Sequence, residues 1–229
     1  MQNDRPSARY IVQRTEILPP ISASWDDPSW RSAQPLAIAS FHPQSSDPRP
    51  HTESRLLHDG NAIAAIFRVE DRYVVARQSS YQSPTHKDSC VEFFVQPKPG
   101  LGYFNFEFNV IGTLLLWYID RPRRDDGSFE HHVEVSLELA RKIAVHPSLT
   151  GSPQEEIAEP LIWTLSFRVP KSLFESFVGP LPDLGGQTRR ANFYKCADLS
   201  SHPHWGAWAA IGDRLDFHQP SRFGELVFA

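Results

Sequence analysis

The segment Tyr103-Phe-Asn-Phe-Glu-Phe-Asn-Val110 alternates aromatic and polar side chains. Successive side chains of a β-strand point to opposite faces of its sheet. The phenylalanines at 104, 106 and 108 therefore share one face, and Asn105, Glu107 and Asn109 share the other. This pattern predicts a strand whose aromatic face lies in a hydrophobic core and whose opposite face carries two amides and a carboxylate.

Two further segments repeat this alternation. In Cys90-Val-Glu-Phe-Phe-Val-Gln96 the residues Val91, Phe93 and Val95 point one way, and Glu92 points the other way with Cys90. In Arg190-Ala-Asn-Phe-Tyr-Lys-Cys196 the polar side chains again fall on one face. The three strands together predict a set of polar groups on outer sheet faces: Glu92, Asn105, Glu107, Asn109, Arg190, Asn192 and Tyr194.

The composition of the whole chain agrees with a β-rich fold. Its 229 residues are 40% hydrophobic and include 15 Phe, and its 20 Pro are scattered between short apolar runs. Such punctuation favours many short strands over long helices. We predict an all-β protein, one domain over residues 1–229, built as a two-sheet antiparallel β-sandwich with one short helix at Lys171–Phe177. The other expected strands include Tyr10–Gln13, Ala62–Val69, Tyr73–Ala76, Lys142–Val145, Leu161–Val169 and Glu225–Phe228, with long loops at Pro43–His51 and Pro147–Pro160.

Several classes of partner are excluded by simple properties of the sequence. The formal charge is −4, and no run of Lys or Arg is dense enough for nucleic acid. No apolar stretch approaches the roughly 20 residues of a membrane helix. The first ten residues are polar, which predicts a cytoplasmic protein unless this chain is the trimmed, mature form of an exported one. Two cysteines cannot make a disulfide framework.

The polar faces have an unusual composition for solvated strands. Asn is depleted in strands because its side chain competes for backbone hydrogen bonds. Amide, carboxylate and guanidinium groups side by side match the donors and acceptors of vicinal hydroxyls, and Trp or Tyr rings can cover the C–H face of a pyranose. The pattern therefore predicts a sugar-binding surface, and a solvated face or a buried hydrogen-bonded network is the structural alternative.

Several motifs carry a family resemblance. Asp88-Ser-Cys-Val-Glu-Phe-Phe-Val95, the 103–109 run followed by Gly112, and Arg190-Ala-Asn-Phe-Tyr-Lys-Cys-Ala-Asp198 resemble carbohydrate-binding modules of family 9, above all the free-standing bacterial branch. His202-Pro-His-Trp205, Trp208 and the segment 216–228 fit that branch too. The resemblance runs from about Trp25 to the end. It implies a β-sandwich related to DOMON domains, sugar binding, and a link to carbohydrate catabolism and glycoside hydrolases.

The resemblance also implies roles for single residues. Glu92 should accept hydrogen bonds from ligand hydroxyls, and the amides of the 103–109 strand should line the same groove. The better-known modules clasp the sugar between two aromatic rings. The first region here, Tyr81-Gln-Ser-Pro-Thr-His86-Lys87, has no Trp, so Tyr81 or His86 would take that place. Trp205 or Trp208 would supply the second ring.

Two other functions remain open from the sequence. Glu92 and Glu107 on neighbouring strands would supply the two carboxyl groups that a hydrolase acting on O-glycosyl compounds needs. A hydrogen-bonded pair with Arg190 is the structural alternative for these glutamates. A non-catalytic scaffold without a ligand is the third reading. The identity of the sugar and the oligomeric state are left open.

Cofactor binding has few candidates. Haem ligation between Met and His is disfavoured, because the only methionine is Met1. A loop-rich region offers metal ligands, but hydrogen-bonded or solvated histidines account better for them: His202, His204, His218, Asp198 and Asp216. Structural calcium would need oxygen ligands such as Asp26, Asp27, Asp125 and Asp126. Cys90 and Cys196 are expected on adjacent strands as reduced thiols.

Overall fold

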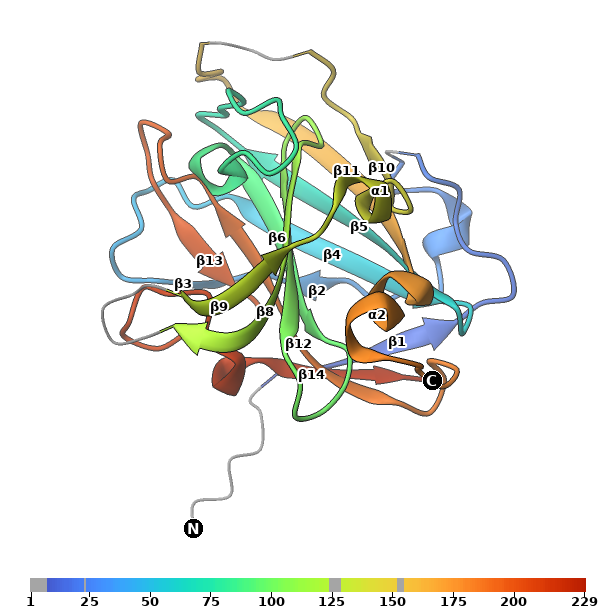
Figure 1. Ribbon diagram of the computed structural model, residues 1–229. Coiled ribbons are helices and arrows are strands. Elements are labelled where there is room, and N and C mark those ends of the chain that lie inside the picture. Colours follow the sequence, from blue (N-terminus) through green and yellow to red (C-terminus); the bar gives the residue numbers. More distant parts are fainter. Residues whose placement is uncertain (1–7, 23, 124–128, 152–154) are drawn as a thin grey trace.

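The computed structural model describes residues 8–22, 24–123, 129–151 and 155–229, and its strands form a sandwich of two sheets joined at one strand (Figure 1). The first sheet has the order β1 (Arg9–Arg14), β14 (Gly224–Phe228), β12 (Thr188–Cys196), β6 (Cys90–Gln96), β7 (Tyr103–Asn109), β8 (Leu114–Arg123) and β9 (Phe129–Glu134). A short strand, β13 (Trp205–Ala207), pairs with the end of β12, and β3 (Ser40–Phe41) pairs with β13. The second sheet has the order β1, β4 (His51–His58), β5 (Ala62–Asp71), β11 (Leu161–Pro170) and β10 (Ala144–Pro147), with β2 (Leu36–Ala37) beside β4.

Strand β1 belongs to both sheets. Its first part, Arg9–Val12, pairs with β14, and Gln13 and Arg14 pair with β4. Both pairings are parallel, whereas every other pairing between described strands is antiparallel. The predicted all-β sandwich is confirmed, and its antiparallel character holds everywhere except at β1.

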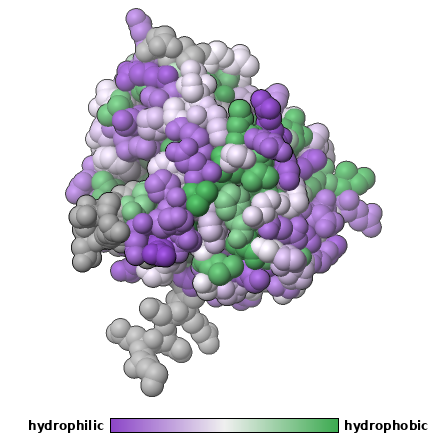
Figure 2. Space-filling view, in the orientation of Figure 1, coloured by the Kyte–Doolittle hydropathy of each residue, from purple (hydrophilic) through white to green (hydrophobic). Residues whose placement is uncertain are grey.

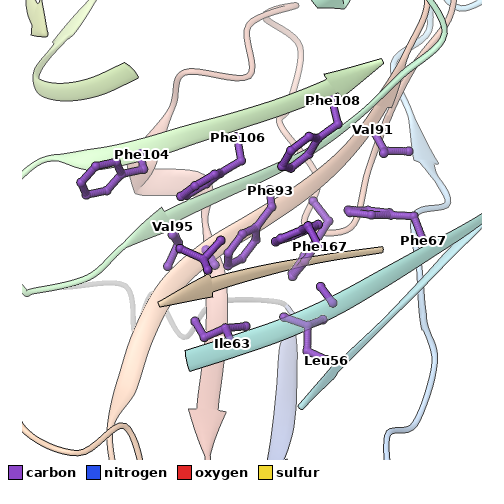
Figure 3. Packing of buried hydrophobic residues seen from close by; sticks show 14 of the residues in the cluster. Leu56, Ile63, Phe67, Val91, Phe93, Val95, Phe104, Phe106, Phe108 and Phe167 are labelled. Carbon is purple, nitrogen blue, oxygen red and sulfur yellow. The ribbon is translucent and has the colours of Figure 1, made fainter. Parts of the chain in front are cut away.

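The core between the sheets is aromatic, as the alternation in β7 predicts. Phe106 lies fully buried between Phe93 of β6 and Phe167 of β11, with ring centroids 5.9 Å and 6.5 Å away (Figure 3). Phe108 stacks on Phe167 at 4.9 Å. Burial of each such ring stabilises the fold by about 1.5–3 kcal/mol, so these inward faces fix which side of the first sheet is turned outward.

The outward face of the first sheet is buried as well. All seven residues of β7 are buried, the polar ones included. Segments from the C-terminal part of the chain cover this face: β13 pairs with the end of β12, and residues 208–223, here named the covering loop, follow it. The hydrogen bonds that hold the covering loop begin at Asn192 of β12, whose side chain exchanges two bonds of 2.9 Å with the backbone of Ala209.

The helices are short. The predicted helix is confirmed as α2 (Lys171–Val178), whose Phe174 and Phe177 pack edge-on against Phe104 at 5.3 Å. A second, one-turn helix, α1 (Leu137–Ala140), begins after Ser136, whose hydroxyl accepts a bond from the Leu139 amide. The 3-10 turns are η1 (Pro28–Trp30), η2 (Thr85–Lys87) and η3 (Pro220–Arg222). None of the described helices is long and apolar enough to cross a membrane.

Two local predictions differ from the structure. The segment Tyr73–Ala76 forms only an isolated bridge between Val74 and Ile157, because Tyr73 adopts φ = 63° and turns the chain after β5. The strand expected at Lys142–Val145 begins two residues later, after the turn that closes α1.

On the side of the molecule shown in Figure 2, hydrophilic residues surround a smaller apolar area.

Candidate functional site

A cavity of about 350 Å³ lies between the outward face of the first sheet and the segments that cover it. Its sheet side is formed by Glu92 of β6, Glu107 of β7, Cys196 of β12, and Leu115 and Trp117 of β8. The remaining lining residues come from η2, β9 and the C-terminal segments: His86, Phe129, Asp198, Trp205, Leu215, Asp216, Phe217 and His218.

Two facing carboxylates dominate this cavity. Glu92 and Glu107 are direct cross-strand partners, and their side chains therefore project together from neighbouring strands. One oxygen of each is occupied: Glu92 Oε1 accepts from Cys196 Sγ at 3.1 Å, and Glu107 Oε1 accepts from Asn105 Nδ2 at 2.8 Å. Within the described chain, the Oε2 atom of each is buried and accepts no hydrogen bond. A buried carboxylate oxygen without a donor is costly, so both oxygens are fit to receive ligand donors.

The two carboxylates have different electrostatic surroundings. Burial, the adjacent Cys196 and the charge of Glu107 raise the pKa of Glu92 well above its ordinary value, which favours its protonated form. Glu107 Oε2 lies 3.4 Å from His86 Nδ1, an ion-pair distance without good hydrogen-bond geometry. Burial lowers the pKa of His86, but the Glu107 carboxylate outweighs burial and raises it overall. The Glu107 carboxylate and the His86 imidazole thus form the polar contact on one side of the pair, opposite the Cys196 thiol beside Glu92.

Aromatic rings form much of the remaining wall. Trp117 packs against His132 and Phe129 at centroid distances of 4.3 Å and 5.6 Å, and its indole Nε1 is buried without a hydrogen-bond acceptor in the described chain. Trp205 donates its Nε1–H to Asp198 Oδ1 at 2.7 Å. Ring contacts on Trp117 and the hydrogen bond from Trp205 thus fix the orientation of the two indoles.

The covering loop is attached to the sheet by Tyr194. The Tyr194 ring stacks on Phe217 at 4.0 Å, and its hydroxyl donates to the Phe217 carbonyl at 2.9 Å. Tyr194 is fully buried beneath Phe217 and does not line the cavity, where the sequence placed it as a stacking ring.

Four of the predicted site residues meet at the cavity: Glu92, Glu107, His86 and Trp205. Asn105 lies directly behind them. Its side chain donates to Glu107 and accepts from the Trp117 amide at 2.7 Å, so it orients the carboxylate without reaching the cavity.

The other predicted residues lie elsewhere and bond mainly to backbone. Asn109 donates to Asp88 and the Gln78 carbonyl, and Asn192 holds Ala209. An amide side chain carries both donor and acceptor, which suits it to a crossing loop as well as to a ligand. Three more residues do not line the cavity: Arg190 donates to the Ser221 carbonyl, Tyr81 donates to the Val135 carbonyl, and Trp208 packs on Phe193.

Several lining residues were not predicted as sugar ligands. Leu115 and Trp117 are the register partners of Glu107 and Asn105 on β8, so the same alternation rule would have found them once that register was known. No alternation of this kind marks the covering loop, because its lining residues do not lie on a strand. Their place at the cavity could not be read from a strand pattern. These residues are Leu215, Asp216, Phe217 and His218.

One group of side chains has metal-ligand geometry in the described residues: ligand atoms of Cys90, Glu92 and Cys196 all lie within 4.8 Å of one another. The cysteines are cross-strand partners, as expected, and both are free and buried. Burial raises the pKa of Cys90 to about 12 and that of Cys196 well above its ordinary value. A metal there would have to displace both thiol protons, which makes this group a poor preformed site.

The other metal candidates do not converge in the described chain. His204 is fully buried and accepts from Lys195 Nζ at 2.8 Å, and His218 lies 2.9 Å from the Tyr103 hydroxyl. Asp27 caps η1 by accepting from Ser29, and Asp26 is exposed. The pair Asp125 and Asp126 lies outside the described residues.

The comparisons with known proteins agree with this architecture. The model of carbohydrate-binding family 9 matches residues 32–228. The chain belongs to carbohydrate-binding family 9. A "putative carbohydrate-binding protein" from Bacteroides uniformis is 30% identical, and the alignment covers 96% of this chain and 99% of that one with a TM-score of 0.82.

More distant structures share the family 9 fold. A family 9 module from Caldicellulosiruptor kristjanssonii in complex with glucose is 14% identical over 97% of this chain and 96% of that one, with a TM-score of 0.64. The complex of such a module with cellotriose gives 15% identity over 96% and 93%, with a TM-score of 0.63. Among curated proteins, none matches the chain.

Proposed function

We propose that this family 9 chain binds a carbohydrate in the cavity between the first sheet and the covering loop. The observation that carries the proposal is the facing pair Glu92 and Glu107, each with a buried oxygen that accepts no hydrogen bond in the described chain. Sugar hydroxyls donate hydrogen bonds to such oxygens. Family membership and the glucose and cellotriose complexes of structurally similar modules support the same class of ligand.

The other lining groups suit a pyranose. The buried Trp117 Nε1–H is a donor without an acceptor in the described chain, so a ring oxygen or hydroxyl would complete it. The indoles of Trp117 and Trp205 offer apolar surface for the C–H face of a sugar ring. The cavity of about 350 Å³ lies at the small end of ligand pockets, about 300–1,000 Å³, which favours a mono- or disaccharide.

Isothermal titration calorimetry with glucose, galactose, xylose and cellobiose tests this proposal. Glu107→Gln replaces the carboxylate that faces His86 by an amide of nearly the same shape. Hydrogen bonds to charged groups contribute about 1.5–3 kcal/mol, which corresponds to roughly 10- to 100-fold weaker binding of whichever sugar binds. The matched control is Glu53→Gln, at a half-buried glutamate of β4 in the second sheet, and it should leave the affinity unchanged.

The outcomes separate the three readings of the sequence. Absence of binding to a broad glycan array by the folded protein would favour a scaffold and overturn the proposal. Equal affinity of Glu107→Gln and the native chain would place the sugar elsewhere. Circular dichroism of each variant verifies that the fold is retained.

A second candidate, glycoside hydrolysis, has one observation in its favour. Glu92 and Glu107 face each other, and a raised pKa such as that of Glu92 is the property that a general acid needs. Release of nitrophenol from nitrophenyl glycosides measures this activity. Catalysis requires that Glu92→Gln binds sugar but loses turnover, whereas pure binding requires no turnover in the native chain. If the protein binds a sugar without hydrolysing it, its part in carbohydrate catabolism would be to recognise that sugar.

A further inference from the structure

The charged groups that line the cavity are nearly all of one sign. Its lining contains four carboxylates, those of Glu92, Glu107, Asp198 and Asp216, and no Lys or Arg in the described chain. We propose that the preferred ligand is an amino sugar with a free ammonium group, held between Glu92 and Glu107. This inference rests on the proposed carbohydrate site and names the class of sugar that it takes.

Three Lys or Arg side chains of the described chain lie near the cavity, and none of them lines it. Lys87 of η2 is exposed and acts on His86 and Asp198 from outside the cavity. Lys195 Nζ points into the sandwich, where it lies 3.3 Å from Asp71 Oδ2 and donates to His204. Arg214 is exposed, and its Nη2 lies 3.4 Å from Asp216 Oδ2. Among the described residues, no Lys or Arg therefore lies within ion-pair distance of the Glu92–Glu107 pair, and the nearest titratable cation is His86 beside Glu107.

Within this acidic lining, Glu92 and Glu107 offer the best-defined acceptors for a ligand. Glu92 is 1% exposed and Glu107 is 4% exposed, yet both line the cavity with an Oε2 atom that accepts no hydrogen bond in the described chain. Two neighbouring carboxylates cannot both ionise without a compensating positive charge. A neutral hydroxyl supplies a donor but no charge, whereas an ammonium supplies three donors and one charge.

Binding of an ammonium should therefore move a proton. Glu92 has a raised pKa in the free protein because of its burial, the adjacent Cys196 and the charge of Glu107. When the ammonium enters, the Glu92 carboxyl releases its proton to the buffer and becomes a carboxylate. The two carboxylates are then balanced by the ammonium of the ligand and by the imidazolium of His86 beside Glu107. A neutral sugar gives no such release, and a uronic acid is repelled.

Matched sugar pairs test the inference. Calorimetry at pH 7.0 and low salt compares glucosamine with glucose and galactosamine with galactose, and adds N-acetylglucosamine and glucuronate. At least one amino sugar should bind about tenfold more tightly than its parent, and its N-acetyl form should lose that gain. Repeating the titration in buffers of different ionisation enthalpy should reveal proton release for the amino sugar alone.

Substitutions test whether the carboxylates cause the preference for amino sugars over their neutral parents. Glu92→Gln should bring the amino-sugar-to-parent affinity ratio close to one and abolish the proton release, while Glu53→Gln should keep both. Tighter or equal binding of neutral parents would overturn the amino-sugar inference and leave the sugar site in place. Absence of binding to every sugar would overturn both, and each result is scored only for protein with native circular dichroism.

Discussion

Replacing Asp71 by alanine removes one half of an ion pair that connects the two sheets. Lys195 Nζ of β12 lies 3.3 Å from Asp71 Oδ2 of β5, and the two side chains are 0% and 1% exposed. Lys195 also donates to the Cys196 carbonyl at 3.0 Å, and Asp71 accepts from Trp163 Nε1 at 3.0 Å. After the substitution, the Lys195 charge would remain buried without its carboxylate.

The size of the effect follows from this burial. Removing one partner of a buried ion pair costs about 3–5 kcal/mol. A loss of about 4 kcal/mol lowers the ratio of folded to unfolded protein nearly 1,000-fold, since each 1.4 kcal/mol is a factor of about ten. The native pair need not be strongly stabilising, because desolvation of both charges offsets their attraction. We therefore expect the double variant Asp71→Leu with Lys195→Met to recover most of the loss.

Urea unfolding followed by circular dichroism at pH 7 measures these differences. The matched control is Glu130→Ala, which breaks an exposed ion pair of 3.2 Å with Arg121 and should cost about 1 kcal/mol or less. If Asp71→Ala loses no more stability than this control, the reasoning is refuted, because Lys195 would then shed its proton or reach water without help from Asp71.

Three further predictions concern titratable groups. Burial and the charge of Lys195 lower the pKa of His204 from 6.5 to about 3, so between these pH values only the unfolded chain gains that proton. The urea midpoint should therefore fall as pH drops from 6.5 to about 3. His204→Gln should make this dependence of the midpoint on pH weaker. Burial raises the pKa of Glu92 above 4.5, so the stability that its protonated carboxyl contributes is lost as pH rises past the unfolded-state pKa. Glu92→Gln should therefore raise the Tm at pH 7 but not at pH 4. An equal gain in Tm at both pH values would contradict burial of an ionisable Glu92 as the reason. The buried thiols of Cys90 and Cys196, whose pKa values are raised, should react with dithionitrobenzoate at pH 7.5 only after urea is added, and a rapid native reaction would count against their burial.

The fold could be predicted because the strands of the first sheet encode it locally. Phe104, Phe106 and Phe108 can be buried together only in a strand, and β6 and β12 repeat that pattern. Strand β1 could not be assigned to two sheets from sequence, because its parallel pairings join residues far apart in the chain. One-turn α1 was missed because four residues show no helical period.

The site was only partly predictable for a related reason. Alternation places Glu92 and Glu107 on one face, and the structure places both at the cavity. The same alternation cannot tell whether a polar side chain meets a ligand or a crossing segment of backbone. Asn109 and Asn192 bond to loops that return from distant parts of the sequence, and no local pattern encodes those contacts.

The position of β1 has a mechanical consequence. Arg9 to Val12 run parallel to Glu225 to Phe228, and further backbone bonds at Ala8 and Ala229 extend the pair at its two ends. Tension applied between the start of β1 and the end of β14 pulls these strands along their length in opposite directions. Their hydrogen bonds are then loaded in shear and must break together instead of opening one after another. A molecule tethered by both ends would keep its sheets closed under load, with the cavity between β6 and the covering loop preserved.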